Sequence, residues 1–241
     1  FEERLGYIEG GTETLANTQA QKIQELNGRI HYKQPATKVL IEDNQVRGVE
    51  TANGQQFFAE NVISTIPTPL IPKLLKDQED SIRAPYEAID NVGVVCVLFK
   101  LSKPVTDNFW VNVSDERFDI PGFVEFSNLR PTGDDWVVYV PFYMPHSNPK
   151  FQQSDDAFIA ESLRCLQAVN AEITDEMVKS THVARLKYAQ PVCDVGFAAK
   201  IPAHKTPISG LQIADTCFYY PEDRGVSESI KFAKKMIDEI D

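Results

Sequence analysis

The first hydrophobic pattern along the chain has the period of an amphipathic helix. Leu15, Ile23 and Leu26 fall near one face of a helix and would turn that face toward a core. We expect Thr12 to cap this helix, because its hydroxyl can accept a bond from a free backbone N–H. Gly28 is expected to end it, since glycine adopts the left-handed conformation without strain.

The pattern then changes to short runs rich in β-branched residues, which indicates strands. Asn53-Gly54 is a strong hairpin signal, because both residues accept a positive φ angle. The run 61–66 is largely apolar, as expected for a strand buried on both faces of a parallel sheet. The strands expected in this region are 29–32, 37–41, 46–51, 55–59 and 61–66.

From residue 92 onward the strands are longer, and clusters of Pro, Gly and Asp separate them, which is typical of an antiparallel sheet. The sequence therefore predicts the α+β class, with a mixed, largely antiparallel sheet flanked by helices. The expected strands are 92–101, 109–113, 122–127, 136–142, 181–186 and 211–215. Helices are expected at 70–75, approaching 88, beginning at 154, and at 225–240.

Composition and charge narrow the class of protein. The 241 residues are 42% hydrophobic and 24% charged, which describes a water-soluble globular chain with a sizeable core. Lys and Arg total 24 against 35 for Asp and Glu, and the net charge of −11 disfavours nucleic acid and anionic membranes as partners. The apolar runs are far shorter than the ~20 residues of a membrane span, so none is expected.

Cysteine and histidine offer no metal site in the sequence. The four cysteines match neither a redox CxxC pair nor a zinc pattern, and the four histidines show no ligand spacing. We expect Cys96, Cys165, Cys193 and Cys217 to be buried, reduced thiols. With no secretory leader visible, this predicts a cytoplasmic location. Because the chain begins with Phe1, we interpret it as a piece of a longer protein.

The most informative chemistry lies between the strand 211–215 and the closing helix. Asp215 ends the strand, where a carboxylate can accept hydrogen bonds from sugar-like hydroxyls. Gly225 precedes the helix, where free backbone N–H groups can approach an electron-rich ligand atom. An acidic turn ahead of a terminal helix, with no ligand role, fits the same residues. The sequence contains no glycine-rich dinucleotide loop, P-loop or nucleophile elbow.

Several segments, taken in order, resemble the flavin-containing amine oxidase and protoporphyrinogen oxidase superfamily, to which phytoene and other carotenoid desaturases are related. They are Gly10-Gly11-Thr12 with its helix, 34–39, 46–51, 61–65 and 211–240. The segments 188–191 and 220–225 resemble a bacterial subgroup of protoporphyrinogen-oxidase-like proteins. The resemblance covers nearly the whole chain.

The resemblance implies an FAD-dependent oxidoreductase, whose flavin accepts a hydride from a small organic substrate. Ala36 would contact the adenine through its backbone, and Asp215 the ribityl or pyrophosphate region. Gly225 and Val226 would lie near the pyrimidine edge of the flavin. Ala214 stands where the family commonly has Gly, and its methyl would crowd this approach. The residues implied on the substrate side are Tyr188, Tyr219, Tyr220 and Arg224; no catalytic base is assigned.

Family members also carry an N-terminal GxGxxG half that holds the dinucleotide pyrophosphate, and this half is absent from the chain. We therefore expect 1–66 and 211–241 on the FAD-binding side, and 67–210 as the substrate-binding domain. The chain alone should bind FAD weakly or not at all, and its partner would be the missing half. Strands at 62–66 and 212–215 would leave exposed edges, through which the chain could self-associate.

Other functions remain open. A flavin-dependent nucleotide-sugar mutase or isomerase would use the same fold without net redox, and a non-catalytic relative would keep it as a binding module. The tyrosines are equally suited to core or interface packing, and Arg224 to an ion pair with Glu222 or Asp223. The substrate is not fixed by the sequence, because related folds act on amines, porphyrinogens and polyenes.

Overall fold

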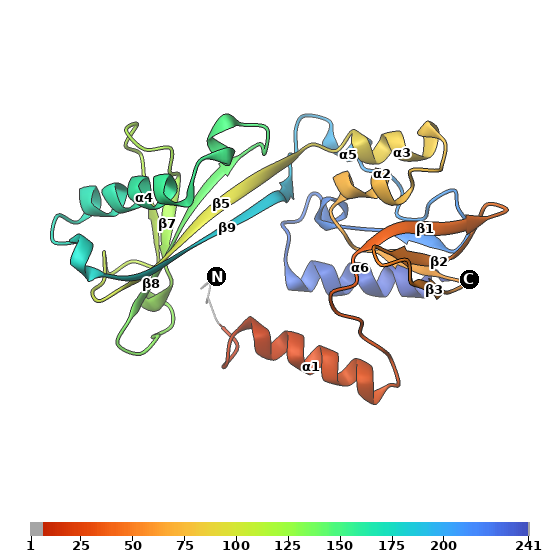
Figure 1. Ribbon diagram of the computed structural model, residues 1–241, viewed down its shortest axis with the longest axis horizontal. Helices are drawn as coiled ribbons and strands as arrows, with labels where there is room; N and C mark the ends of the chain where they lie inside the picture. Colours follow the sequence, from red (N-terminus) through yellow and green to blue (C-terminus); the bar gives the residue numbers. More distant parts are fainter. Residues whose placement is uncertain (1–6, 241) are drawn as a thin grey trace.

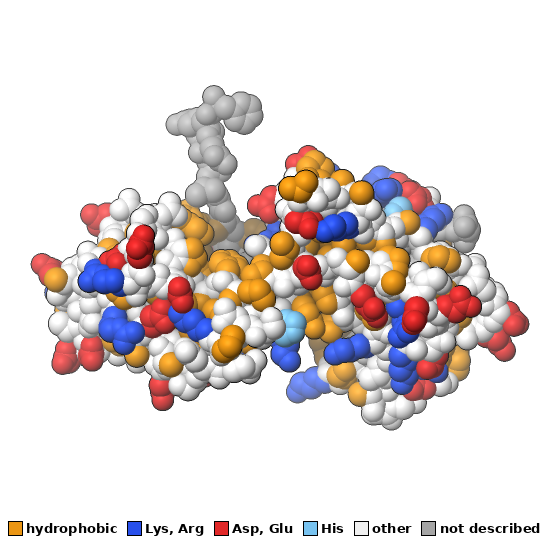
Figure 2. Space-filling view, turned by 90° about the horizontal axis from the view of Figure 1, so that it is seen from above, with side chains coloured by type: hydrophobic (Ala, Val, Ile, Leu, Met, Phe, Trp, Pro, Cys, Tyr) orange, Lys and Arg blue, Asp and Glu red, His pale blue; other side chains and the backbone are white. Residues whose placement is uncertain are grey.

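The computed structural model describes residues 7–240, which fold into two lobes (Figure 1). Hydrophobic side chains gather across the waist where the lobes meet (Figure 2). The helices are α1 (Thr12–Glu25), α2 (Ile71–Leu74), α3 (Asp80–Glu87), α4 (Asp155–Val169), α5 (Phe197–Lys200) and α6 (Val226–Asp238). The strands are β1 (Ala36–Glu42), β2 (Gln45–Thr51), β3 (Gln56–Phe58), β4 (Val62–Ser64), β5 (Asn91–Leu101), β6 (Trp110–Asn112), β7 (Gly122–Glu125), β8 (Trp136–Met144), β9 (Val178–Pro191) and β10 (Leu211–Ile213).

One lobe is built on a five-stranded antiparallel sheet with the order β6-β7-β8-β5-β9. Helix α4 covers one face of this sheet (Figure 1). Alternate side chains of β5, among them Val95, Val97 and Phe99, are fully buried on that face. Phe158 and Leu166 of α4 belong to the same cluster. The expected antiparallel sheet and the α+β class are therefore confirmed.

The other lobe joins a β-meander to two parallel strands. Strands β1, β2 and β3 are antiparallel neighbours, and β10 pairs in parallel with β4. The turn between β1 and β2 uses Asp43 and Asn44, whose φ angles of 49° and 58° match the twist of a tight hairpin. One buried cluster, which includes Val39, Ile71 and Leu211, ties the meander, α2 and the parallel pair together.

The two parallel strands differ in how their outer edges are covered. The edge of β10 is covered by the chain itself, since Ile213 N–H donates to His204 O (2.8 Å) and Thr206 N–H donates to Leu211 O (3.2 Å). Within residues 7–240, β4 pairs with β10 alone. Val62 N–H donates to Gly210 O, and Ser64 O accepts from Ala214 N–H. Because backbone groups alternate sides along a strand, those of Ile63 point to the free edge.

Some expectations for single elements are wrong. Residues 29–32 form no strand; the chain turns there, with Lys33 at a φ of 56°. Gly11 rather than Thr12 occupies the N-cap of α1, and Asn27, at a φ of 61°, takes the left-handed position expected for Gly28. Ile63 is 36% exposed, so β4 is not buried on both faces as expected.

The amphipathic helices bury less than their patterns predict. Helix α1 has no buried residue, and Ile23 and Leu26 are exposed on it. In α6 the buried residue is Met236, whereas Ile230 and Ile237 are exposed. Cys193 is also exposed, contrary to expectation, although Cys165 and Cys217 are buried.

A buried carboxylate anchors the loop that precedes β6. Glu125 of β7 is fully buried and accepts bonds from Val105 N–H (2.7 Å), Thr106 N–H (2.8 Å) and the Thr106 hydroxyl (3.1 Å). Burial raises the pKa of Glu125 above its ordinary value of 4.5, despite these three donors. The nearby carboxylate of Asp107 raises this pKa further, because a second negative charge disfavours ionisation of Glu125.

We predict that Glu125→Ala lowers the free energy of unfolding by about 2–6 kcal/mol, because a buried and a part-buried backbone N–H group lose their acceptor at about 1–3 kcal/mol each. Since the pKa of Glu125 is raised in the folded protein, ionising this group costs the wild type stability. The difference in free energy of unfolding between wild type and Glu125→Ala should therefore shrink as the pH rises above 4.5. Urea unfolding at several pH values measures this. Ser162→Ala is the matched control, because the buried Ser162 hydroxyl has no partner; an equal loss in both variants would contradict the assignment.

Candidate functional site

A cavity of about 300 Å³ lies beyond the carboxyl ends of the parallel strands β4 and β10. This is where open α/β sheets commonly bind ligands. Its volume is at the lower end of the ~300–1,000 Å³ range of ligand pockets. The residues that line it are Thr65, Pro67, Asn91, Tyr188, Ala189, Gln190, Ala214, Asp215, Thr216, Tyr219, Ser229, Phe232, Ala233 and Met236.

Asp215 is held rigidly at the end of β10. Its Oδ1 accepts from Cys217 N–H (2.8 Å), and its Oδ2 accepts both from Thr68 N–H (2.5 Å) and from the Thr68 hydroxyl. A carboxylate offers about four acceptor positions, so about one remains for a ligand. The carboxylate expected at this strand end is therefore on the cavity wall, but most of its bonding capacity is used within the chain.

Helix α6 forms one wall of the cavity. Ser229, Phe232, Ala233 and Met236 lie on one face at helical spacing. The Tyr219 hydroxyl donates to Ser229 Oγ (3.1 Å), and the Ser229 hydroxyl donates to Gly225 O (2.9 Å). This relay fixes the Tyr219 ring beside the start of the helix.

The N-terminus of α6 already faces a carboxylate. Helix α6 begins at Val226, with Gly225 as N-cap. A methyl group on Gly225 would lie 2.6 Å from Glu228 Oε2, so this side chain fills the space in front of the glycine. An acidic group is favourable there because of the helix dipole. A ligand that used these N–H groups would have to displace Glu228, and the contact with Gly225 and Val226 stays a prediction.

A second hollow, of about 430 Å³, adjoins the cavity through Gln190 and Thr216 and contains Arg224. The Arg224 guanidinium donates to Ala189 O (3.1 Å), while Asp223 accepts from the Arg224 backbone N–H. Tyr188 packs edge-on against His146, with ring centroids 5.4 Å apart. Three of the four residues expected on the substrate side, Tyr188, Tyr219 and Arg224, therefore line connected hollows.

Four expected site residues do not line these hollows: Gly225 and Val226, described above, and also Tyr220 and Ala36. Tyr220 packs edge-on against Phe197, with ring centroids 5.4 Å apart. Ala36 is exposed at the first position of β1. Ala214, whose methyl was expected to crowd the approach, is 5% exposed, so little of that methyl enters the cavity.

The sequence analysis missed the residues that hold Asp215 in place. Thr68 is fully buried, and its Oγ1 lies 3.6 Å from Cys217 Sγ. Burial and the neighbouring Asp215 raise the pKa of the Cys217 thiol far above its ordinary value, and burial raises the pKa of Tyr86 to about 12. Cys217 is thus an unreactive packing residue. The prolines on either side of Thr68 were the available signal, since they mark a rigid turn after β4.

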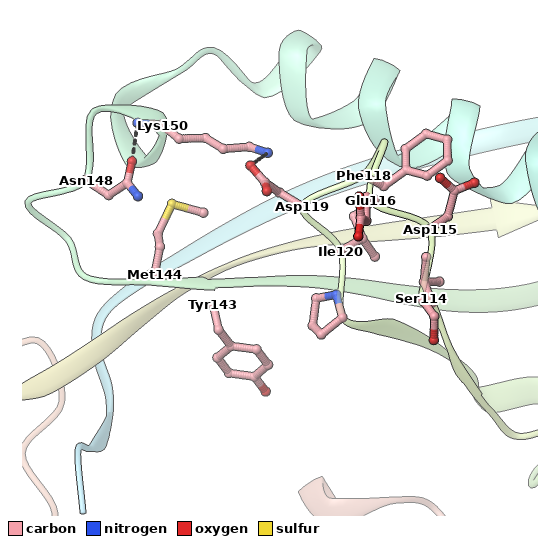
Figure 3. A pocket seen from close by; sticks show the side chains of 12 residues that line it. Ser114, Asp115, Glu116, Phe118, Asp119, Ile120, Tyr143, Met144, Asn148 and Lys150 are labelled. Carbon is pink, nitrogen blue, oxygen red and sulfur yellow. Dashed lines mark hydrogen bonds and ion pairs between the residues drawn. The ribbon is translucent and has the colours of Figure 1, made fainter. Parts of the chain in front are cut away.

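A larger hollow of about 580 Å³ lies in the five-stranded lobe (Figure 3). Its acidic rim is mostly neutralised by its own neighbours. Lys150 binds Asp119 (3.0 Å), and Arg117 binds both oxygens of Asp115, whose pKa is lowered to about 2. Figure 3 shows Tyr143 pointing away from these groups, so they form no convergent set. The strand-end cavity is the better candidate.

The residues present fit a flavin at that cavity. Asp215 at the strand end keeps about one acceptor position for a ligand hydroxyl, and Ala214 leaves the approach to it open, whereas Glu228 already faces the N-terminus of α6. The cavity alone is small for a whole dinucleotide. None of the described helices is long and apolar enough to cross a membrane.

Comparisons with known proteins identify related sequences. Residues 1–216 match the family described as flavin containing amine oxidoreductase. Prolycopene isomerase 2 from an Oncidium hybrid cultivar is 35% identical over 60 residues, which are 25% of this chain and 10% of that protein. Prolycopene isomerase from Daucus carota is 32% identical over 76 residues, or 31% of this chain and 12% of that protein.

Solved structures share the fold. A candidate protoporphyrinogen oxidase from Exiguobacterium sp. 255-15 has a TM-score of 0.77 at 19% identity, covering 97% of this chain and 51% of its own. An oxidoreductase from Methanosarcina mazei has a TM-score of 0.67 at 17% identity, and the match covers 86% of this chain and 49% of that one. Reduced UDP-galactopyranose mutase has a TM-score of 0.61 at 13% identity, and the match covers 79% of this chain and 42% of that one. The chain thus spans about half the length of the structures it matches.

Proposed function

Because the chain belongs to the flavin-containing amine oxidoreductase family, we propose that it forms the substrate side of an FAD-dependent oxidoreductase. The observation that best supports this is the cavity beyond β4 and β10, with Asp215 in its wall and α6 beside it. When bound, the flavin would supply the redox chemistry by accepting a hydride from an organic substrate.

The chain's own residues would bind and orient the flavin. Asp215 would accept one hydrogen bond from a ribityl hydroxyl, through the acceptor position that Thr68 and Cys217 leave open. Tyr219 would form part of the ring-binding wall, since Ser229 holds its hydroxyl. We assign no catalytic base, because hydride transfer depends chiefly on orientation.

The free edge of β4 would receive a parallel strand from a dinucleotide-binding half. Two-stranded parallel sheets are rarely stable alone, and parallel sheets are normally covered on both faces. Ile63, 36% exposed, presents its backbone at this edge, whereas the chain covers the outer edge of β10. A second copy of the chain is the alternative occupant. It would appear as a molecular mass that rises with protein concentration.

The substrate would lie against the face of the five-stranded sheet opposite α4. Helix α1 lies on that side (Figure 1) but buries none of its residues. Leu186 is 60% exposed there. Alternation and register place four cross-strand rows on this face: Leu186, Val94 and Tyr143; Ala184, Cys96 and Pro141; His182, Leu98 and Tyr139; Ser180, Lys100 and Val137. The outermost row carries Lys100, which pairs with Asp135 (2.6 Å), and the other three rows hold no Asp, Glu, Lys or Arg, so we propose a largely apolar substrate.

We predict that the 241-residue chain alone binds FAD weakly, whereas a polypeptide that also carries the dinucleotide-binding half is purified with flavin bound. The physical reason is the small cavity and the free β4 edge of the chain alone. Absorbance of bound flavin in the two purified proteins measures this. Tight, stoichiometric binding by the chain alone would contradict the need for the other half.

A redox-neutral isomerase is the second candidate function, favoured by the two sequence relatives that are named as isomerases. The same flavin-loaded protein separates the two. Turnover that requires an electron acceptor supports the oxidoreductase, and turnover without any acceptor supports the isomerase. A longer protein that never takes up flavin would support a non-catalytic binding module.

We predict that Ala184→Lys weakens binding of diphenylhexatriene, an uncharged conjugated polyene, by about tenfold, because a charge in an apolar contact must be desolvated. Ala184 lies between the rows of Leu186 and His182 on the open face and is exposed, so the fold should tolerate the change. Fluorescence titration measures the affinity. Thr181→Lys is the control, since Thr181 is exposed opposite Phe99 on the α4 side. Equal effects of the two variants would contradict a substrate role for this face.

A further inference from the structure

We propose that Thr68 is a positioning residue for flavin binding and acts through Asp215. The inference rests on the proposed function. It assigns to Thr68 the task of fixing the Asp215 carboxylate, so that the remaining acceptor position faces the cavity.

Two donors of Thr68 converge on a single carboxylate oxygen. Its backbone N–H lies 2.5 Å from Asp215 Oδ2, and its hydroxyl donates to the same atom. Cys217 N–H holds the other oxygen at 2.8 Å. With both oxygens held, the plane of the carboxylate cannot turn about its terminal torsion, which is otherwise broad.

The turn that carries Thr68 is itself restricted. Pro67 and Pro69 flank Thr68, and each fixes its own φ angle. Leu70 N–H donates to Pro67 O (2.8 Å) and closes the turn. Thr68 is fully buried, so water does not compete for its hydroxyl. The donors are therefore placed before any ligand arrives, which lowers the ordering cost of binding.

A purely structural role would also explain these contacts, and it makes a different prediction. If Thr68 only supports the fold, removing its hydroxyl lowers the melting temperature without changing FAD affinity in the folded protein. If Thr68 positions Asp215, affinity falls in the folded protein, and the fall disappears once Asp215 can no longer act as a carboxylate.

The test is FAD titration of the deflavinated full-length protein, read by quenching of flavin fluorescence, with the melting temperature measured in parallel. We expect Thr68→Val to raise the Kd about tenfold or more, as for loss of a hydrogen bond to a charged group. Thr68→Ser keeps the hydroxyl and should stay within about threefold of wild type. Thr68→Val combined with Asp215→Asn should bind no more weakly than Asp215→Asn alone, because both act through one carboxylate.

Thr132→Val is the matched control, because the Thr132 hydroxyl bonds Ser127 Oγ (2.6 Å) and Asp135 O (2.5 Å) in the other lobe. It should leave the Kd unchanged. Thr68→Ala replaces Thr68→Val if the valine variant does not fold. Unchanged FAD affinity in Thr68→Val would overturn the positioning role of Thr68 and leave the proposed function standing. A loss of affinity in the double variant that adds to the loss in Asp215→Asn would do the same. A wild-type protein that takes up no FAD would overturn the proposed function and this inference with it.

Discussion

The contact between Asp215 and Thr68 holds the candidate site together. It joins the turn after β4 to the turn after β10, two segments 147 residues apart in the chain. The parallel pairing of β4 with β10 brings these turns side by side, and the carboxylate then satisfies three donors that would otherwise lack an acceptor.

The rest of the molecule is arranged around this joint. One lobe supplies the strand ends and α6, and the other supplies an open, apolar sheet face. Strand β9 connects the two, because Ala184 lies on the open face and Tyr188, near its end, lines the cavity. A flavin at the strand ends and an apolar substrate on the sheet would therefore approach each other at the waist of the molecule (Figure 2).

The sequence predicts those elements of the fold that depend on local residue patterns. The alternation in β5 and β8 gave the antiparallel sheet, and α4 begins where expected, with the Ser154 hydroxyl as its cap, accepting from Ala157 N–H (3.3 Å). Prediction from the sequence fails where contacts with distant segments determine the structure. Residues 29–32 have a strand-like composition but no partner strand among the described residues, and helix α1 buries none of its residues against a core. Asp215 could be found from its strand end. The prolines beside Thr68 mark a rigid turn, but no local spacing relates that turn to Asp215, so the contact between the two could not be predicted.

A crystal structure of the flavin-loaded protein would test the account most directly. The distance to measure is that between Asp215 Oδ1 and the nearest ribityl hydroxyl. The account predicts a hydrogen bond of at most about 3.2 Å, with both Thr68 donors still on Oδ2. A flavin bound away from the ends of β4 and β10, or an Asp215 that contacts only Thr68 and Cys217, would contradict it.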